Sequence, residues 1–247
     1  VKHDAVLIAT GVYKARDIQV PGIGLSGVVP ALDFLTASNR KSLGDDVAEF
    51  DSGVLNAGNK NVVVIGGGDT AMDCVRTAIR QNAKSVTCLY RRDKVNMPGS
   101  QREVQNAEEE GVNFQWLSAP HALLGDGSVQ AVRARRIHLG QPDETGRQVP
   151  QIIENSDFDV DADLVIKALG FDPEDLPVMF DYPELGVSKW GTIQIDWKTM
   201  MTSSPGVFAA GDIVRGASLV VWGIRDGRDA AEQMDKYIQA EQRGESL

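Results

Sequence analysis

An apolar run that ends in three consecutive glycines constrains the fold of this 247-residue chain more than any other feature. The stretch Val62–Asp73 reads VVVIGGGDTAMD, with a helical pattern after the glycines. This order is typical of a buried parallel strand, a tight turn and a helix. Because parallel strands need crossover connections, usually helices, the pattern predicts an α/β protein.

The glycine motif has the spacing of a dinucleotide-binding turn, with Gly66, Gly68 and Ala71 at the three small positions. The first glycine allows a tight turn, the second lets the backbone approach a pyrophosphate, and the third small residue lets the helix pack closely on the strand. Amides at the start of the helix then hold the anion. The flanking strand and helix favour this interpretation over a purely structural glycine turn.

The end of the next strand indicates which dinucleotide is bound. In NAD-binding units an acidic residue about twenty positions further on binds the ribose hydroxyls. Here the segment reads LYRRD, so Arg91 and Arg92 stand in that place. A pair of guanidinium groups can fork onto a 2′-phosphate, which predicts NADP(H). The alternative is a basic surface pair bridged to neighbours such as Asp93.

A second glycine–acid pattern lies near the C-terminus. Residues 203–216 read SSPGVFAAGDIVRG, a short strand that ends in Ala-Gly-Asp. The carboxylate can bond a sugar-alcohol hydroxyl, and the glycine leaves room for a pyrophosphate. A long helix expected over 218–242 would point its positive end at any nearby ring that becomes anionic, such as a reduced flavin. An ordinary strand, turn and helix is the alternative.

Two apolar runs, DAVLIATG at 4–11 and DLVIKALG at 163–170, share residues at matching places. Such a repeat suggests two related units, one nested inside the other. Residues 129–139 should form a strand with arginines on one face, which we interpret as an exposed face rather than a partner surface. The segment 43–60 is interpreted as a hinge or insertion. Further helices are expected at 31–41, 69–82 and 101–111, and further strands at 61–66, 85–90, 112–117, 191–196, 206–212 and after a turn at 142–146.

Composition excludes several classes of function. A net charge of −10 disfavours binding to nucleic acid and to anionic membranes, and no apolar run is long enough to span a bilayer. Cys74 and Cys88 are too few to hold an iron–sulfur cluster, so we expect reduced core thiols and a cytoplasmic protein. No nucleophile or metal-ligand cluster stands out, and we assign no catalytic side chain. Hydride transfer to a cofactor requires none.

Three strings together carry a resemblance to a known family: GGGDTAMD, the segment YRRD…NMPGS, and AAGDIVRG. The chain resembles the small (beta) subunit of NADPH-dependent glutamate synthase over nearly its whole length. Related alternatives are the electron-input region of dihydropyrimidine dehydrogenase and the NADPH subunit of ferredoxin:NADP oxidoreductases. The chain opens on a strand pattern without an initiator methionine, and it looks like the C-terminal half of such a subunit.

The resemblance implies a Rossmann-like NADP-binding domain inserted into parts of an FAD-binding α/β domain. Residues 1–56 would be the first FAD-domain piece and a hinge, 57–173 the NADPH domain, and 174–247 the last FAD-domain piece. It also implies site residues. Those on FAD would be Thr10, Gly11, Gly211, Asp212, Leu219 and Val220; those on NADPH would be Gly66, Gly68, Asp69, Thr70, Arg91 and Arg92, with Gly170 also facing the nicotinamide cofactor.

The function implied is hydride transfer from NADPH to FAD. In this family electrons continue through iron–sulfur clusters to the large (alpha) subunit, where glutamate is made from 2-oxoglutarate and glutamine. The cluster domain and the first glycine motif for FAD are absent from this sequence, so its FAD site would be completed by the missing N-terminal half of the subunit. A different class remains open, an NADPH-binding and docking module without turnover of its own.

Overall fold

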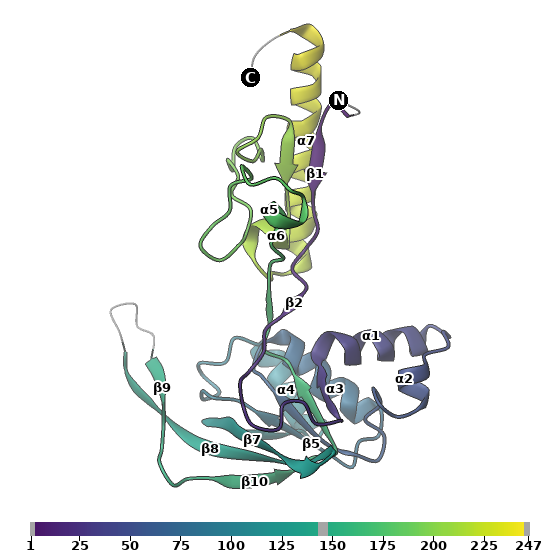
Figure 1. The fold of residues 1–247 in the computed structure, drawn as a ribbon, viewed down its shortest axis with the longest axis vertical. Coiled ribbons are helices and arrows are strands. Elements are labelled where there is room, and N and C mark those ends of the chain that lie inside the picture. The colour runs from purple at the N-terminus through teal and green to yellow at the C-terminus, as the bar shows by residue number, and fades with distance from the viewer. Residues whose placement is uncertain (1–2, 143–147, 245–247) are drawn as a thin grey trace. The chain divides into compact units, whose positions relative to one another are not determined.

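The computed structural model describes residues 3–142 and 148–244, which fall into two compact units (Figure 1). Residues 17–170 form one, called here the inserted unit. The chain before it and the chain from Phe171 onward form the other, the flanking unit. Each unit is described by itself.

The inserted unit is built on a sheet of five parallel strands. Both faces of such a sheet are covered, which explains why the neighbouring strands 61–65 and 164–167 are rich in valine and isoleucine without polar alternation. On the central strand, Val62 and Val64 point into one core and Val63 and Ile65 into another. In spatial order the strands are β3 (Val28–Pro30), β11 (Leu164–Lys167), β4 (Asn61–Ile65), β5 (Ser85–Leu89) and β6 (Asn113–Gln115).

Helices cover one face of this sheet (Figure 1). They are α1 (Ala31–Ser42), α3 (Asp69–Arg80) and α4 (Gln101–Glu109), while the short α2 (Ala48–Asp51) lies in the segment expected to be a hinge. On α3, the side chains of Ala71, Cys74, Val75 and Ala78 are fully buried, as the helical spacing predicts.

An antiparallel sheet covers the opposite face and contains the arginine-bearing strand (Figure 1). Along that strand Val132 and Ala134 are buried, whereas Arg133 pairs with Asp159 at 2.8 Å on the exposed side. Arg136 departs from the expected one-sided pattern, since its guanidinium lies 4.0 Å from the ring centroid of Phe158, which packs against the core. The strands are β7 (Ser118–Asp126), β8 (Ser128–Pro142), β9 (Gln148–Ile152) and β10 (Phe158–Asp161). The turn expected at 142–146 lies almost wholly outside the described residues.

The flanking unit contains two small sheets and a long helix. Strand β1 (Val6–Ile8) runs parallel to β13 (Val207–Ala209), and β2 (Lys14–Ala15) pairs antiparallel with β12 (Phe171–Asp172). Its core includes Phe208, whose ring meets that of Tyr237 on the long helix edge to face. The helices are α5 (Leu176–Met179), α6 (Asp212–Arg215) and α7 (Val220–Arg243).

Three expectations about the fold need correction. The first boundary lies at Arg16/Asp17 rather than at 56/57, because β3 pairs with β11 and α1 packs on α3. The second lies at Gly170/Phe171, three residues before the expected 173/174. The strand expected at 191–196 does not form. Ile193 and Asp196 instead make isolated bridges to Val187 and Met201.

Candidate functional site

The predicted nucleotide-binding residues gather at one edge of the parallel sheet. From β4 the chain moves outward to β5 and β6, then returns to β11 on the other side of β4. Ligands of open α/β sheets bind at the carboxyl ends of the strands where the order reverses in this way. Gly66 follows β4, Arg91 follows β5 within two residues, and Gly170 comes shortly after β11.

The glycine turn is shaped by its neighbours. A Cβ atom on Gly66 would lie 2.1 Å from the carbonyl oxygen of Ala168, and one on Gly67 would lie 2.3 Å from the ring of Tyr90. Neither position can therefore carry a side chain. At Gly68 an added Cβ would meet nothing within 4 Å. The turn is closed on its inner side and open at Gly68, where a pyrophosphate can approach the backbone.

Helix α3 begins at this opening. Gly68 is its N-cap, and no side chain caps the amides of the first turn. Those amides and the positive end of the helix dipole suit an anion. Thr70 lies in the first turn, as predicted. The carboxylate of Asp69, however, accepts a hydrogen bond from the Ser100 amide at 2.9 Å. Asp69 is an exposed residue, so this bond ties the carboxylate to the chain without removing it from solvent.

The guanidinium group of Arg92 has buried hydrogen-bond donors that are left without acceptors among the described residues. Its Nε and Nη2 atoms are buried and lack a hydrogen-bond partner in the described part of the chain. Buried donors are normally paired, so this guanidinium calls for an acceptor. Arg91 is exposed beside it. Asp93 accepts instead from the amide and side chain of Asn96, both at 2.8 Å, and forms no ion pair with either arginine.

Tyr90 packs between the arginines and the glycine turn. Its side chain is 9% exposed, and its hydroxyl donates to the carbonyl of Asn96 at 3.4 Å. Burial raises the pKa of the phenol, while the charges of Arg92 and Arg91 act in the opposite direction. The uncharged ring therefore lines the site beside Gly67. Sequence reasoning missed Tyr90 and Gly67, although the middle glycine of the GGG run, which the fingerprint does not require, marks the close approach.

In the flanking unit, two more pairs of predicted residues meet. Thr10 and Gly11 follow β1, and Gly211 and Asp212 follow β13. Because β1 and β13 are adjacent and parallel, both pairs lie at the same carboxyl edge. A glycine therefore follows each of the two strands at this carboxyl edge, and the lack of a side chain leaves its backbone accessible to a ligand.

The start of α7 is fastened to that edge by a buried carboxylate. Asp226 is 1% exposed and accepts from Nε and Nη2 of Arg215 at 2.5 and 2.7 Å. The Arg215 hydrogen bond holds the pKa of Asp226 below its usual range, and the backbone of Gly211 contributes in the same direction. Leu219 and Val220, at the start of α7, are 58% and 76% exposed.

Other chemistries find little support. Among residues 3–142 and 148–244, no group of three or more His, Cys, Asp or Glu side chains is arranged to hold a metal ion. Over the same ranges, the helices are too short or too polar to cross a bilayer. Cys74 and Cys88 are buried free thiols, as expected. Burial raises the pKa of Cys88 to about 12.

The reversal at β4, the glycine turn and the unsatisfied arginine define a dinucleotide-binding α/β protein. The chain belongs to the pyridine nucleotide-disulphide oxidoreductase family, whose model matches residues 1–242. It is 68% identical over 239 residues to the glutamate synthase [NADPH] small chain of Azospirillum brasilense. The matched region covers 97% of this chain and 50% of that protein. The resemblance expected from the motifs is thereby confirmed.

A second relative gives the same picture. A putative glutamate synthase [NADPH] small chain of Cereibacter sphaeroides is 64% identical over 96% of this chain and 57% of its own length. The chain thus spans about half the length of these curated relatives.

Solved structures support the fold. FprA of Mycobacterium tuberculosis in complex with NADPH matches 99% of the chain and 66% of its own, with a TM-score of 0.76 at 18% identity. Thioredoxin reductase of Lactococcus lactis matches 95% of the chain and 66% of its own, with a TM-score of 0.68 at 25% identity. The predicted fold class, a Rossmann-like α/β domain inserted into parts of a second α/β domain, is confirmed.

Proposed function

We propose that the inserted unit binds NADPH across the carboxyl edge of β4. The pyrophosphate lies over Gly68 and the first turn of α3, and the 2′-phosphate lies on Arg91 and Arg92. The unpaired, buried Nε and Nη2 of Arg92 carry the proposal, because a phosphate supplies the acceptors that these donors lack. Asp69 and Thr70 shape the turn, and Gly170 borders the nicotinamide side.

The activity proposed is hydride transfer from NADPH to FAD. Bound NADPH supplies the hydride, and the chain's own residues hold and orient it. The FAD-facing residues are Thr10, Gly11, Gly211, Asp212, Leu219 and Val220. Support for this role comes from the family to which the chain belongs and from the paired glycines at the edge of β1 and β13. We infer that the FAD site is incomplete in this chain, because the described residues place two parallel strands, β1 and β13, at that edge.

This chain spans about half the length of its relatives, and we propose that an N-terminal half of the subunit supplies the remaining parts of the site. We place the first glycine motif for FAD and the iron–sulfur clusters in that half. The physiological role proposed is electron input to the large (alpha) subunit of glutamate synthase for reductive synthesis of glutamate from glutamine and 2-oxoglutarate. The names and identities of the relatives support it. The free buried thiols support the expected cytoplasmic location.

Removing both arginines tests the nucleotide site. Each charged contact contributes ~1.5–3 kcal/mol, so Arg91→Ala/Arg92→Ala should weaken NADPH by roughly 10²–10⁴-fold and leave NADH nearly unchanged. Calorimetric titration with both nucleotides measures the ratio. Arg80→Ala is the matched control, because Arg80 sits at the other end of α3, away from the carboxyl edge. A double variant that still prefers NADPH to NADH would refute the assignment.

A visible spectrum tests the flavin step. The chain, and a full-length subunit of the length of its relatives, are incubated with FAD and freed of excess FAD. We expect the full-length subunit to keep a flavin band that NADPH bleaches, and the chain alone to bind NADPH with little or no flavin. If the full-length subunit also binds NADPH without a bleachable band, the chain is a docking module and the oxidoreductase proposal fails.

A further inference from the structure

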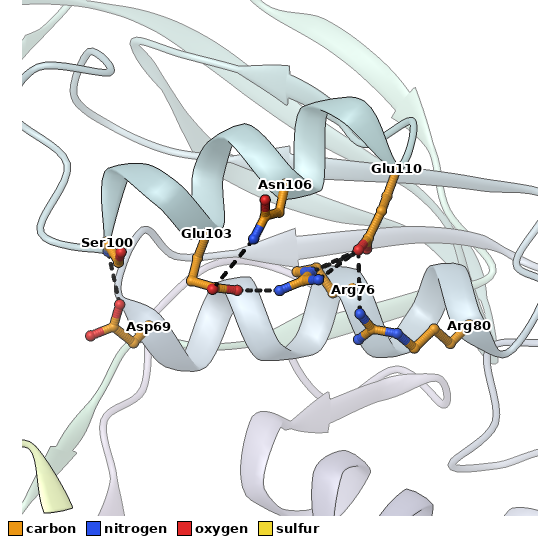
Figure 2. A network of polar contacts seen from close by, with 7 residues as sticks. All are labelled: Asp69, Arg76, Arg80, Ser100, Glu103, Asn106 and Glu110. Atoms are coloured by element: carbon orange, nitrogen blue, oxygen red, sulfur yellow. Dashed lines mark hydrogen bonds and ion pairs between the residues drawn. The ribbon is translucent and has the colours of Figure 1, made fainter.

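The segment that carries the two arginines is fastened to the glycine turn at its far end. Residues 91–100, called here the arginine loop, connect β5 to α4. The amide of Gly99 donates to the carbonyl of Gly67 at 3.0 Å. The amide of Ser100 donates to the carboxylate of Asp69 at 2.9 Å, as the close-up in Figure 2 shows. The loop therefore begins beside the turn at Tyr90 and returns to it at Ser100.

The loop is braced by hydrogen bonds within it and by an ion pair to α4. Asp93 accepts from both the amide and the side chain of Asn96 at 2.8 Å. Lys94 pairs with Glu108 on α4 at 2.7 Å. These bonds limit bending between Arg92 and Ser100, the stretch through which a contact at Ser100 would have to act on the arginines.

The helices on either side are held together independently. Arg76 on α3 pairs with Glu103 and Glu110 on the α4 side (Figure 2). This contact fixes the helix bodies, while the Asp69–Ser100 bond fixes their N-terminal ends. Asp69 places a negative charge beside the proposed pyrophosphate, where charge alone opposes an anionic ligand. The hydrogen bond from the Ser100 amide explains why a carboxylate can stand at that position: it holds the end of the arginine loop.

We propose that Asp69 is a positioning residue that locks the arginine loop onto the glycine turn and thereby sets the preference for NADPH over NADH. This inference rests on the proposed NADPH site. An arginine held in place before binding loses less conformational freedom when it meets the 2′-phosphate. NADH lacks that phosphate, so its affinity depends on the turn and not on the placement of the loop.

The test compares affinities for NADPH and NADH in matched variants by calorimetric titration. Asp69→Ala removes the acceptor, and the NADPH:NADH preference should fall about tenfold, the effect of one charge-assisted hydrogen bond. Asp69→Asn keeps an acceptor oxygen and should stay within about threefold of the wild-type preference. Asp73→Ala removes an exposed carboxylate one turn further along α3 and should leave the preference unchanged.

A second variant tests the same bond from the other side. Ser100→Pro removes the donor amide at a position whose φ of −55° already suits proline. It should lower the preference as Asp69→Ala does. In both variants, hydrogen exchange should rise in peptides from residues 91–100 and stay unchanged in β4. This readout keeps the test decisive if either variant is unstable.

The outcomes separate this inference from the proposed function. In the Arg91→Ala/Arg92→Ala background, Asp69→Ala should cause no further change in preference, since the locked groups are gone. If that background still prefers NADPH, the proposed site itself is wrong. If it loses the preference but Asp69→Ala alone retains it, or if Asp69→Ala weakens both nucleotides equally, the lock is refuted while the NADPH site stands.

Discussion

Replacing Arg76 by methionine measures how much the charged contacts between α3 and α4 contribute to stability. The Arg76 side chain is 19% exposed and pairs with both Glu103 and Glu110 (Figure 2). Its Nη2 and Nε lie 2.6 and 3.0 Å from one oxygen of Glu110. Methionine keeps the apolar stem and removes the charge. The resulting loss in free energy of unfolding therefore measures the contribution of the ion pairs rather than that of the packing.

The exposure of the partners sets the magnitude. A hydrogen bond to a buried charged group contributes ~1.5–3 kcal/mol, and an exposed ion pair no more than about 1 kcal/mol. Glu103 and Glu110 are 38% and 28% exposed, so each pair falls between these limits. We expect Arg76→Met to lower the free energy of unfolding by about 2–3 kcal/mol. For a unit of this size, Tm should fall by roughly 4–12 °C.

Arg80→Met provides the control, because Arg80 is 59% exposed and reaches the same carboxylate at 3.3 Å. Its loss should cost less than about 0.5 kcal/mol. Urea denaturation followed by circular dichroism gives the stability, and hydrogen exchange of α3 and α4 peptides assigns it to the inserted unit. If the two variants unfold at the same urea concentration, the reasoning is refuted.

The same variant carries a pH signature. The Arg76 hydrogen bond lowers the pKa of Glu110. A carboxylate with a lowered folded-state pKa contributes stability that is present above its unfolded pKa and is lost as pH falls through the folded value. The difference in free energy of unfolding between wild type and Arg76→Met should therefore shrink below about pH 4.3. A difference that stays constant into acid would contradict this origin.

Three further predictions follow. Asp226→Asn should lower the free energy of unfolding by about 3 kcal/mol, because it removes the charge that pairs with Arg215. This loss, followed by urea denaturation, should diminish as the pH falls from about 4, the pKa of an unfolded aspartate, through the lowered pKa of folded Asp226. Gly66→Ala should abolish calorimetric NADPH binding, since the added methyl collides with backbone. Cys88, with its pKa raised to about 12, should resist iodoacetamide in the folded protein at pH 8 and react once urea unfolds it.

Local pattern was sufficient for the elements that bury a periodic face. The helix over 69–82, the strand over 61–66 and the helix over 218–242 are present within a few residues of their expected bounds. Several short elements stabilised by distant partners escaped prediction, although β1, which pairs with β13, lies in a predicted apolar run. Strand β3 has three residues and exists because β11, far along the chain, pairs with it. The alternation of apolar and polar residues at 191–196 resembled a strand, yet this segment forms isolated bridges instead of a strand.

The sequence by itself determined the α/β class, the glycine turn and the place of Arg91 and Arg92, because each follows from spacing along a single strand–turn–helix unit. Only the tertiary structure decided which groups meet across the turn. The Asp69 bond to Ser100 joins residues on different helices, and its geometry depends on how α4 packs against α3. The unpaired guanidinium of Arg92 is likewise a property of the folded surroundings, since burial and the absence of a partner arise only when separate segments pack together.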